Sequence, residues 1–188
     1  MKGRRAGSCR LYLSLSWILL TTIGCSFAIR DYALQEVSSP KIPLRVGLYM
    51  APSFRNYLDN RIQLGEGMRK GAEEAARKAF EDVVIIDSLS SAEIPRREIK
   101  ALANPEIVGA GIVLEPTPFR TSIGYQITVK WTIWSLDGRV MYLNTFKGEG
   151  ISRAHFPSIE TSATLAAKEQ YDKFLAHIVS HRWWEAIK

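Results

Sequence analysis

The chain has 188 residues, of which 46% are hydrophobic and only two are cysteine. This length and composition predict one globular domain, because chains of about 150 residues bury roughly 70% of their surface. The net charge of +6 does not indicate a nucleic-acid partner: four of the 25 basic residues and none of the 19 acidic ones precede Cys25, so the remaining chain has 21 basic and 19 acidic residues.

The first 24 residues have the three parts of a secretory signal. A basic start is followed by the apolar run 11–20, and the segment ends on Gly24 next to Cys25. This ending resembles the lipobox of bacterial lipoproteins. The resemblance implies that Cys25 carries a diacylglyceryl group and an N-acyl chain and is the first residue of the mature protein. A plain cleaved signal and an uncleaved anchor are the alternatives, although residues 11–24 are shorter than the roughly 20 apolar residues of a spanning helix.

Residues downstream of Cys25 extend this interpretation. Ser26 follows the cysteine in place of an aspartate, and by the sorting rule of enteric lipoproteins this resembles an outer-membrane, periplasm-facing address. An inner-membrane or a periplasmic location is the alternative. We therefore expect a signal peptide over 1–24, a lipidated N-terminus and tether over 25–42, and a globular domain over 43–188. Because Cys25 is the only mature cysteine, the domain has no internal disulfide and depends on its core.

The first part of the domain predicts a parallel β-α-β unit. Residues 44–50 alternate and are rich in strand formers, and residues 64–80 have apolar positions at helical spacing. Residues 83–86 form a short apolar run typical of a strand buried on both faces. Two parallel strands joined by a helix make a right-handed unit.

The second part predicts an antiparallel meander and a long helix. Pro95 favours a short helix over 95–103, because proline suits a first helical position. Strands are expected over 107–114, 123–134 and 140–146, with the turn signal Asp137-Gly138 between the last two. A C-terminal helix begins near Pro157-Ser158 and carries an apolar stripe as far as His181.

Residues 123–134 form the clearest strand in the sequence. Six apolar residues alternate with polar ones: Ile123, Tyr125, Ile127, Val129, Trp131 and Ile133. This period predicts that Trp131 is buried between sheet and helix, with Thr128, Lys130 and Thr132 on the opposite, solvent-facing side. Trp134 is the one apolar residue that falls on the polar side.

The predicted fold class is α+β: a single mixed sheet packed against helices on one face, with a long C-terminal helix. Over roughly residues 43–182 the element order resembles that of small envelope domains. These are the N-terminal domain of the translocation protein TolB, the lipoprotein activators of penicillin-binding proteins and the lipopolysaccharide-assembly lipoprotein that plugs its barrel. The resemblance is one of order alone, so it implies a fold and assigns no binding residue.

Two patterns invite a chemical interpretation. The glycines of Gly65-Glu-Gly67-Met-Arg-Lys-Gly71 do not have phosphate-loop spacing and favour close helix packing instead. His177 and His181 share one helix face but lack the glutamate of a metalloprotease and two further ligands. No nucleophile elbow is present. We therefore expect no catalytic residues, no metal and no cofactor other than the lipid on Cys25.

Three groups of residues are candidates for partner binding. Phe54, Arg55 and Tyr57 have the composition of a binding hot spot, although aromatic residues there also suit the cover of a sheet end. Trp134 is the second candidate. Trp183 and Trp184 are the third, since amphipathic indoles suit interfaces and headgroup regions.

The sequence thus predicts a membrane-anchored lipoprotein that acts as a non-enzymatic accessory or scaffold subunit of a cell-envelope complex and binds another envelope protein. The first alternative is an accessory to lipid or glycolipid transport, which needs an apolar cavity above roughly 300 Å³. An enzyme is a further alternative, disfavoured because no catalytic constellation is present.

Overall fold

The computed structural model describes residues 27–59, 62–89, 98–116, 121–152 and 158–187. The large sheet consists of β2 (Ile42–Tyr49), β5 (Phe80–Ile86), β6 (Ala101–Pro116), β7 (Thr121–Ser135) and β8 (Val140–Ser152). The helices are α2 (Pro52–Arg55), α3 (Gly65–Ala79), α4 (Ile159–Ile178) and the 3-10 helix η2 (Trp183–Ala186). A small sheet contains β1 (Phe27–Ala28), β3 (Leu58–Asp59) and β4 (Ile62–Gln63).

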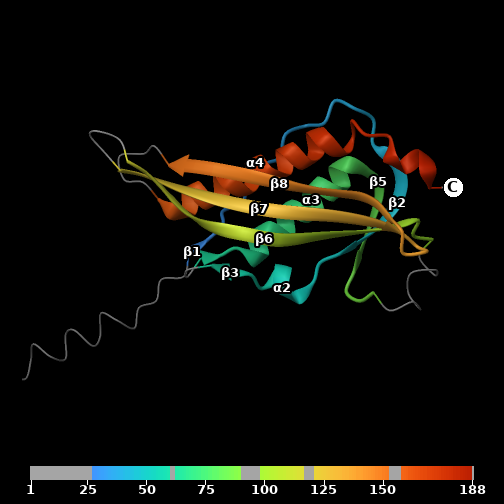
Figure 1. Ribbon diagram of the computed structural model, residues 1–188, viewed down its shortest axis with the longest axis horizontal. Coiled ribbons are helices and arrows are strands. Elements are labelled where there is room, and N and C mark those ends of the chain that lie inside the picture. Colours follow the sequence, from blue (N-terminus) through green and yellow to red (C-terminus); the bar gives the residue numbers. More distant parts are fainter. Residues whose placement is uncertain (1–26, 60–61, 90–97, 117–120, 153–157, 188) are drawn as a thin grey trace, which may run out of the picture.

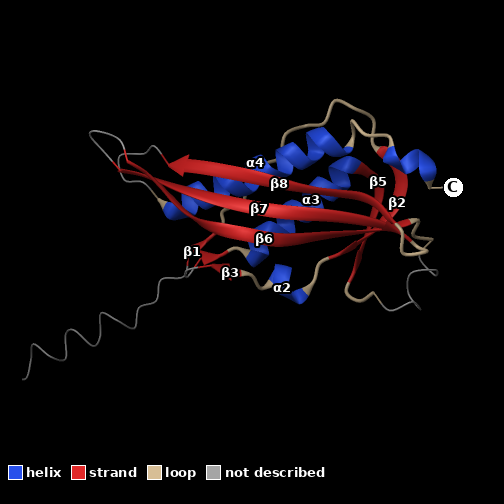
Figure 2. Ribbon diagram, in the orientation of Figure 1, coloured by secondary structure: helices blue, strands red, loops and turns tan. Residues whose placement is uncertain are grey.

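The large sheet is mixed, with strand order β5-β2-β6-β7-β8, and α3 and α4 cover one of its faces (Figures 1 and 2). This arrangement confirms the predicted α+β class and the C-terminal helix. The small sheet, with order β1-β4-β3, was not predicted. Its strands are two residues long, too short to give an alternating sequence pattern.

The β2-α3-β5 unit is parallel, as the sequence predicts. The chain next crosses β2 to pass from β5 to β6. Because crossovers between parallel strands are right-handed, this connection is expected on the face of the sheet opposite to α3. Ile99 in this connection lies over β2: its Cδ1 is 3.1 Å from the position that a Cβ on Gly47 would take. Gly47 therefore leaves room for the crossing chain.

The short helix expected over 95–103 is wrong in its described part. Residues 101–103 are the start of β6 and pair in parallel with Val46–Leu48 of β2. Ala101 and Ala103 are fully buried on the helix side, whereas Leu102 packs with Ile86 and Ile99 on the other side. Pairing with β2 gives this stretch a hydrogen-bonded ladder that outweighs the helix preference of alanine.

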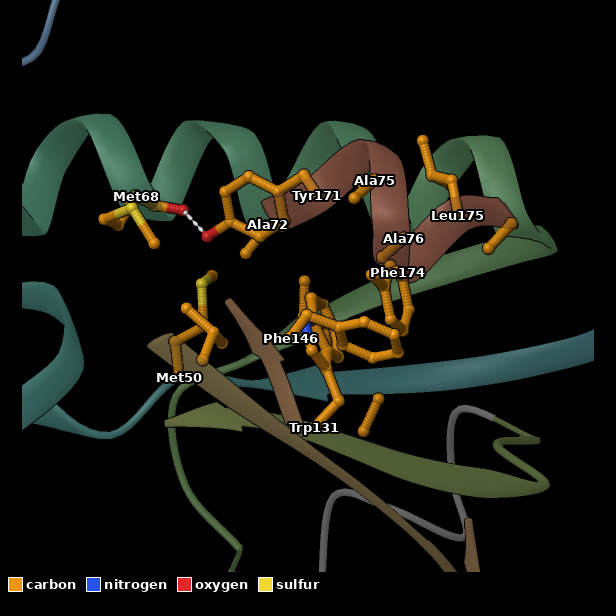
Figure 3. Close-up of a cluster of buried hydrophobic side chains, with 14 of the residues drawn as sticks. Met50, Met68, Ala72, Ala75, Ala76, Trp131, Phe146, Tyr171, Phe174 and Leu175 are labelled. Atoms are coloured by element: carbon orange, nitrogen blue, oxygen red, sulfur yellow. Dashed lines mark hydrogen bonds between the residues drawn. The ribbon is translucent and has the colours of Figure 1, made fainter. Parts of the chain in front are cut away.

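Trp131 occupies the centre of the core, as predicted. Its side chain is fully buried and stacks on Phe174 of α4, with ring centroids 4.0 Å apart and planes 13° from parallel. The ring of Tyr171 meets it edge-on at 6.4 Å. The Tyr171 hydroxyl donates to the carbonyl oxygen of Met68 in α3 over 2.7 Å (Figure 3). One cluster therefore joins both helices to the sheet.

Glycines allow the close approach of α3 to its neighbours. A Cβ on Gly71 would lie 2.5 Å from Cε2 of Tyr171, and a Cβ on Gly67 would lie 2.6 Å from the Cβ of Ile29. Real Cβ atoms do not come this close, so only glycine fits. The packing interpretation of these glycines is confirmed.

The last strand is longer than the sequence indicated, because β8 continues through two glycines to Ser152. A Cβ on Gly148 would lie 1.9 Å from the carbonyl oxygen of Ala166, and one on Gly150 would lie 2.0 Å from that of Ser162. The glycines thus do not end the strand. They let the backbone of α4 lie directly on it.

Residues 27–41, the N-terminal segment, pack along the two helices and do not form a free tether. Ile29 and Leu34 are 8% and 4% exposed and belong to the main core cluster. The backbone N–H of Leu34 donates to Glu74 of α3, and that of Gln35 donates to Asp172 of α4. The tether expectation is therefore wrong over these residues. An extended segment can bury single side chains between two helices without any periodic pattern.

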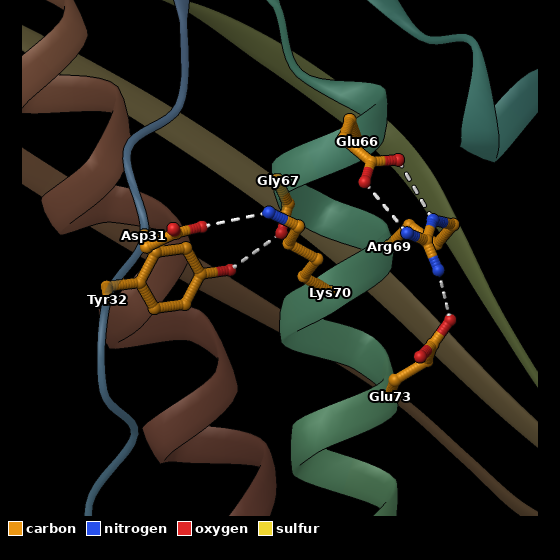
Figure 4. Close-up of polar contacts among 7 residues, drawn as sticks. All are labelled: Asp31, Tyr32, Glu66, Gly67, Arg69, Lys70 and Glu73. Carbon is orange, nitrogen blue, oxygen red and sulfur yellow. Dashed lines mark hydrogen bonds and ion pairs between the residues drawn. The ribbon is translucent and has the colours of Figure 1, made fainter.

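Polar contacts fasten the start of this segment to α3 (Figure 4). Lys70 pairs with Asp31 at 3.1 Å, and the Tyr32 hydroxyl donates to the carbonyl oxygen of Gly67 over 3.3 Å. Beside them Arg69 pairs with carboxylates on its own helix. Burial raises the pKa of the Tyr32 hydroxyl, so this group stays protonated and remains a donor.

Candidate interaction surface

The face of the large sheet opposite to the helices has a polar and an apolar part. Near its middle this face carries ion pairs, among them Lys130 with Glu106. Towards the β7–β8 turn, apolar side chains lie on three neighbouring strands: Leu102, Trp134, Val140 and Leu143. We call these four residues the distal patch and this end of the sheet the distal end. The proximal end is the one at which β6 passes to β7.

Strand register holds the distal patch together. Trp134 lies opposite Leu102 on one side and opposite Val140 on the other. Leu143, two residue pairs further along and therefore on the same face, lies opposite Thr132. Residues directly opposite one another in antiparallel strands have Cβ atoms about 4.5–5.5 Å apart, so Trp134 is in contact range of Leu102 and Val140. Leu143 is a diagonal neighbour of Trp134, at a spacing of about 7–8 Å that long side chains can bridge.

The patch combines exposure with a firm base. Val140 is 51% exposed and Leu143 is 61% exposed, whereas Trp134 is half-buried. Leu102 rests on a second apolar cluster built around the buried Ile86 and Ile99. A half-buried tryptophan with exposed aliphatic neighbours has the composition of a protein-binding hot spot.

The β7–β8 turn that borders the patch is tightly formed. Gly138 has a φ of +84°, a conformation that other residues rarely adopt, and its N–H donates to the carbonyl oxygen of Ser135. The Asp137 carboxylate accepts from Ser135 and from the N–H of Arg139, and these hydrogen bonds lower its pKa. The predicted Asp-Gly turn is confirmed.

The solvent-facing position expected for Thr132 is wrong. Thr132 does point away from the helices, but it is only 6% exposed because it lies between Asn104 and Leu143 on the neighbouring strands. Trp134 is likewise less exposed than its position on a polar face implied. Both differences arise because the sequence pattern of β7 contains no information on which residues stand beside it.

Of the first group of candidates, Phe54 belongs to the core, with only 2% of its surface exposed, which removes it from the contact residues. Arg55 pairs with Asp87 at 3.2 Å and stays partly exposed. The carbonyl oxygen of Tyr57 accepts the N–H groups of Leu64 and of the residue after it at the start of α3. The main structural role of this loop is therefore to join α2 to α3.

Two hollows border Tyr57, of about 330 Å³ and 410 Å³. Their linings mix apolar side chains with charged ones, Glu106 in the smaller and Arg55 and Glu66 in the larger. They are large enough for a small ligand, but they do not have the apolar lining that a lipid carrier needs.

The C-terminal tryptophans pack against the core from the distal end. Trp183 meets Phe80 edge-on with ring centroids 6.3 Å apart and lies 5.8 Å from Tyr142, and Trp184 meets Trp183 edge-on at 6.0 Å. Both indoles are half-buried. They close this end of the fold, and part of each remains at the surface.

His177 and His181 stack with ring centroids 4.0 Å apart. His177 is engaged through both nitrogens, with the Tyr142 hydroxyl 2.9 Å from Nδ1 and the Asn144 amide 3.1 Å from Nε2. Burial, and then the charge of His181, lower the pKa of His177. Among the described residues, no three His, Cys, Asp or Glu side chains are placed to hold a metal ion.

Cys25 lies outside the described residues. Within the described part of the chain, no helix is both long enough and apolar enough to cross a membrane.

No protein-family model matches the chain, and no curated protein matches it. It is similar in structure to PelC from Paraburkholderia phytofirmans, solved as a dodecamer, with a TM-score of 0.48, 14% identity and coverage of 79% of this chain and 98% of that one. It is also similar to a hypothetical protein of Chlamydia trachomatis, with a TM-score of 0.46, 9% identity and coverage of 74% and 97%.

A third similar structure is a minor lipoprotein from Acinetobacter baumannii, with a TM-score of 0.45, 7% identity and coverage of 76% of this chain and 96% of that one. Likeness at this level supports no conclusion about function.

Proposed function

We propose that this chain is a bacterial lipoprotein, held in the outer membrane by acyl chains on Cys25, that serves as a non-enzymatic accessory or scaffold subunit of a cell-envelope complex. The lipid anchor is supported by the signal that ends on Gly24-Cys25. The partner-binding role is supported by the distal patch.

The distal patch carries the proposal because solvent-exposed apolar side chains on adjacent strands mark interaction sites on soluble domains. Its centre is a tryptophan, the residue type most enriched in binding hot spots. Towards the proximal end it is bordered by paired charges such as Lys130–Glu106. An apolar centre with a polar rim is the usual make-up of a protein–protein interface.

Crosslinking in intact cells, followed by identification of what copurifies, tests the proposal. Trp134→Ala and Leu143→Ser are expected to reduce recovery of one envelope protein, while the variants keep a cooperative unfolding transition. Leu165→Ser is the control, because Leu165 is 43% exposed on α4, away from the patch. Unchanged recovery with both patch variants folded would contradict the role of the distal patch.

A further inference from the structure

Only one residue separates Cys25 from the start of β1. Two Cα–Cα steps reach at most about 7 Å, so the acylated residue lies within that distance of Phe27. The backbone of Phe27 is held in place, because it pairs with Ile62 of β4. The site of acylation is therefore tied closely to one point on the domain.

Contacts of the residues that follow β1 also hold the N-terminal segment on the domain. The Arg30 guanidinium pairs with Glu160 of α4 at 2.9 Å, and the Arg30 N–H donates to the hydroxyl of Thr164 over 3.1 Å. With Ile29 buried beside them, the segment has both apolar and polar attachment to the domain.

This attachment point lies at the proximal end of the molecule. Figure 1 shows β1 and β3 in the same half of the molecule as the far ends of β6 and β7, which extend further along the long axis, and the C-terminus at the opposite end. The same end has exposed apolar side chains. Leu58 of β3 is 62% exposed, and near the end of β6, Ile112, Val113 and Leu114 are 41%, 37% and 63% exposed.

We propose that the proximal end rests on the membrane that holds the acyl chains, with Leu58 and Leu114 in the headgroup region. This inference rests on the proposed lipidation of Cys25 and specifies what the short link does. We assign the lipid surface as the contact of the exposed apolar side chains at this end, because the acylated residue is held within about 7 Å of β1.

The charges at this end point to an apolar contact. Arg30 is paired with Glu160 and Lys70 with Asp31, so neither cation is free to attract anionic headgroups. Each unpaired lysine or arginine near an anionic surface contributes about 1 kcal/mol to binding, and among the described residues Arg30 and Lys70 contribute little of this kind. Among the described residues, the exposed apolar side chains of this end are therefore the groups that, with the acyl chains, contact the lipid.

The orientation sets the height of the distal patch. Leu102 and Leu114 are twelve residues apart in β6, which corresponds to about 40 Å at 3.3 Å per residue. The 20 residues of α4 span about 30 Å, so Trp183 and Trp184 also lie far from the lipid. The C-terminal tryptophans are then not headgroup contacts, and the distal patch faces the periplasm.

The single mature cysteine makes a direct test possible. Once Cys25 is acylated, Leu114→Cys or Leu143→Cys provides the only free thiol, and these two side chains are matched at 63% and 61% exposure. Each acylated variant is labelled with bimane and reconstituted into phosphatidylcholine vesicles in which part of the lipid carries brominated acyl chains. Flotation of the vesicles reports attachment, and quenching by bromine reports contact with lipid.

We expect both variants to float, with loss of bimane fluorescence at position 114 and none at position 143. Flotation without quenching at 114, or equal quenching at both positions, would overturn the orientation while leaving the anchor intact. Failure to float would contradict the lipid anchor itself. Quenching at 114 that needs phosphatidylglycerol would overturn the apolar character of the contact.

Discussion

The two ends of the molecule differ in what supports their exposed apolar side chains. At the proximal end, Ile112, Val113 and Leu114 are consecutive and all exposed. Neighbouring strand residues point to opposite faces, so the end of β6 is exposed on both faces of the sheet. At the distal end, Leu102 and Trp134 are partly buried, and Leu102 packs on Ile86 and Ile99.

This difference matches the surfaces that we propose for the two ends. A protein partner is recognised through shape complementarity, and a side chain already held in position loses little freedom on binding. A lipid surface is fluid and adapts to the side chains that enter it. The supported patch is therefore suited to a protein, and the unsupported leucines are suited to lipid.

The largest expected effect comes from removing the anchor. Cys25→Ala removes the site of acylation, and each buried CH₂ of an acyl chain contributes about 0.8 kcal/mol to membrane binding. We expect the variant to lose its acyl groups, to retain its signal and to leave the outer-membrane fraction. Mass spectrometry and fractionation provide the measurement. A variant of unchanged mature mass in the outer membrane would disprove the lipobox assignment.

The core that connects the two ends is expected to be the next most sensitive region. Trp131→Ala should lower the free energy of unfolding by about 3–5 kcal/mol, because it empties the stack on Phe174. Chemical denaturation measures this change. Thr132→Ala is the neighbouring comparison and, since Thr132 is buried, should cost about 1 kcal/mol. Equal losses at the two positions would mean that Trp131 is not the centre of the core.

The N-terminal segment links the proximal end to the membrane, and Leu34 tests it. Leu34→Ala should lower the free energy of unfolding by about 2–3 kcal/mol, because Leu34 is 4% exposed. Leu34→Asp should also release the segment and weaken lipid quenching at position 114 while flotation is kept. The exposed Gln35→Ala is the control. If Leu34→Asp has the unfolding free energy and the lipid quenching of the wild type, the segment is a free tether.

The smallest effect is a pH dependence at the distal end. Burial lowers the pKa of His177 below its ordinary 6.5, so the unfolded chain binds a proton there before the folded chain does. Stability present above pH 6.5 is therefore lost as the pH falls towards 5. The melting temperature of the wild type should fall more between pH 7 and pH 5 than that of His177→Gln. An equal fall in both would contradict this role of His177.

The sequence predicts most of the large sheet because its elements have local signals. The alternation along β7 places Trp131 in the core, and Asp137-Gly138 marks the turn before β8. The helix expected over 95–103 is wrong because Ala101 and Ala103 have helix preference, while their strand state depends on β2, more than 50 residues away. A short stretch of sequence contains no information on pairing with a strand so far away in the chain.

The candidate site is predictable only in part, for a similar reason. Trp134 is identified because it breaks the alternation of its own strand. Leu143 is missed, although it stands between the inward-facing Tyr142 and the polar Asn144, because only the register with β7 shows which residues it joins. The packing of residues 27–41 is missed because its buried side chains, Ile29 and Leu34, have no regular spacing.

The most direct test of the different contacts proposed for the two ends compares photocrosslinking from positions 114 and 143 in intact cells. A benzoylphenylalanine is placed at one position or the other in the full-length protein, and the products are separated into lipid and protein adducts. We expect lipid adducts from position 114 and adducts to one envelope protein from position 143. Protein adducts from position 114 together with lipid adducts from position 143 would contradict this expectation.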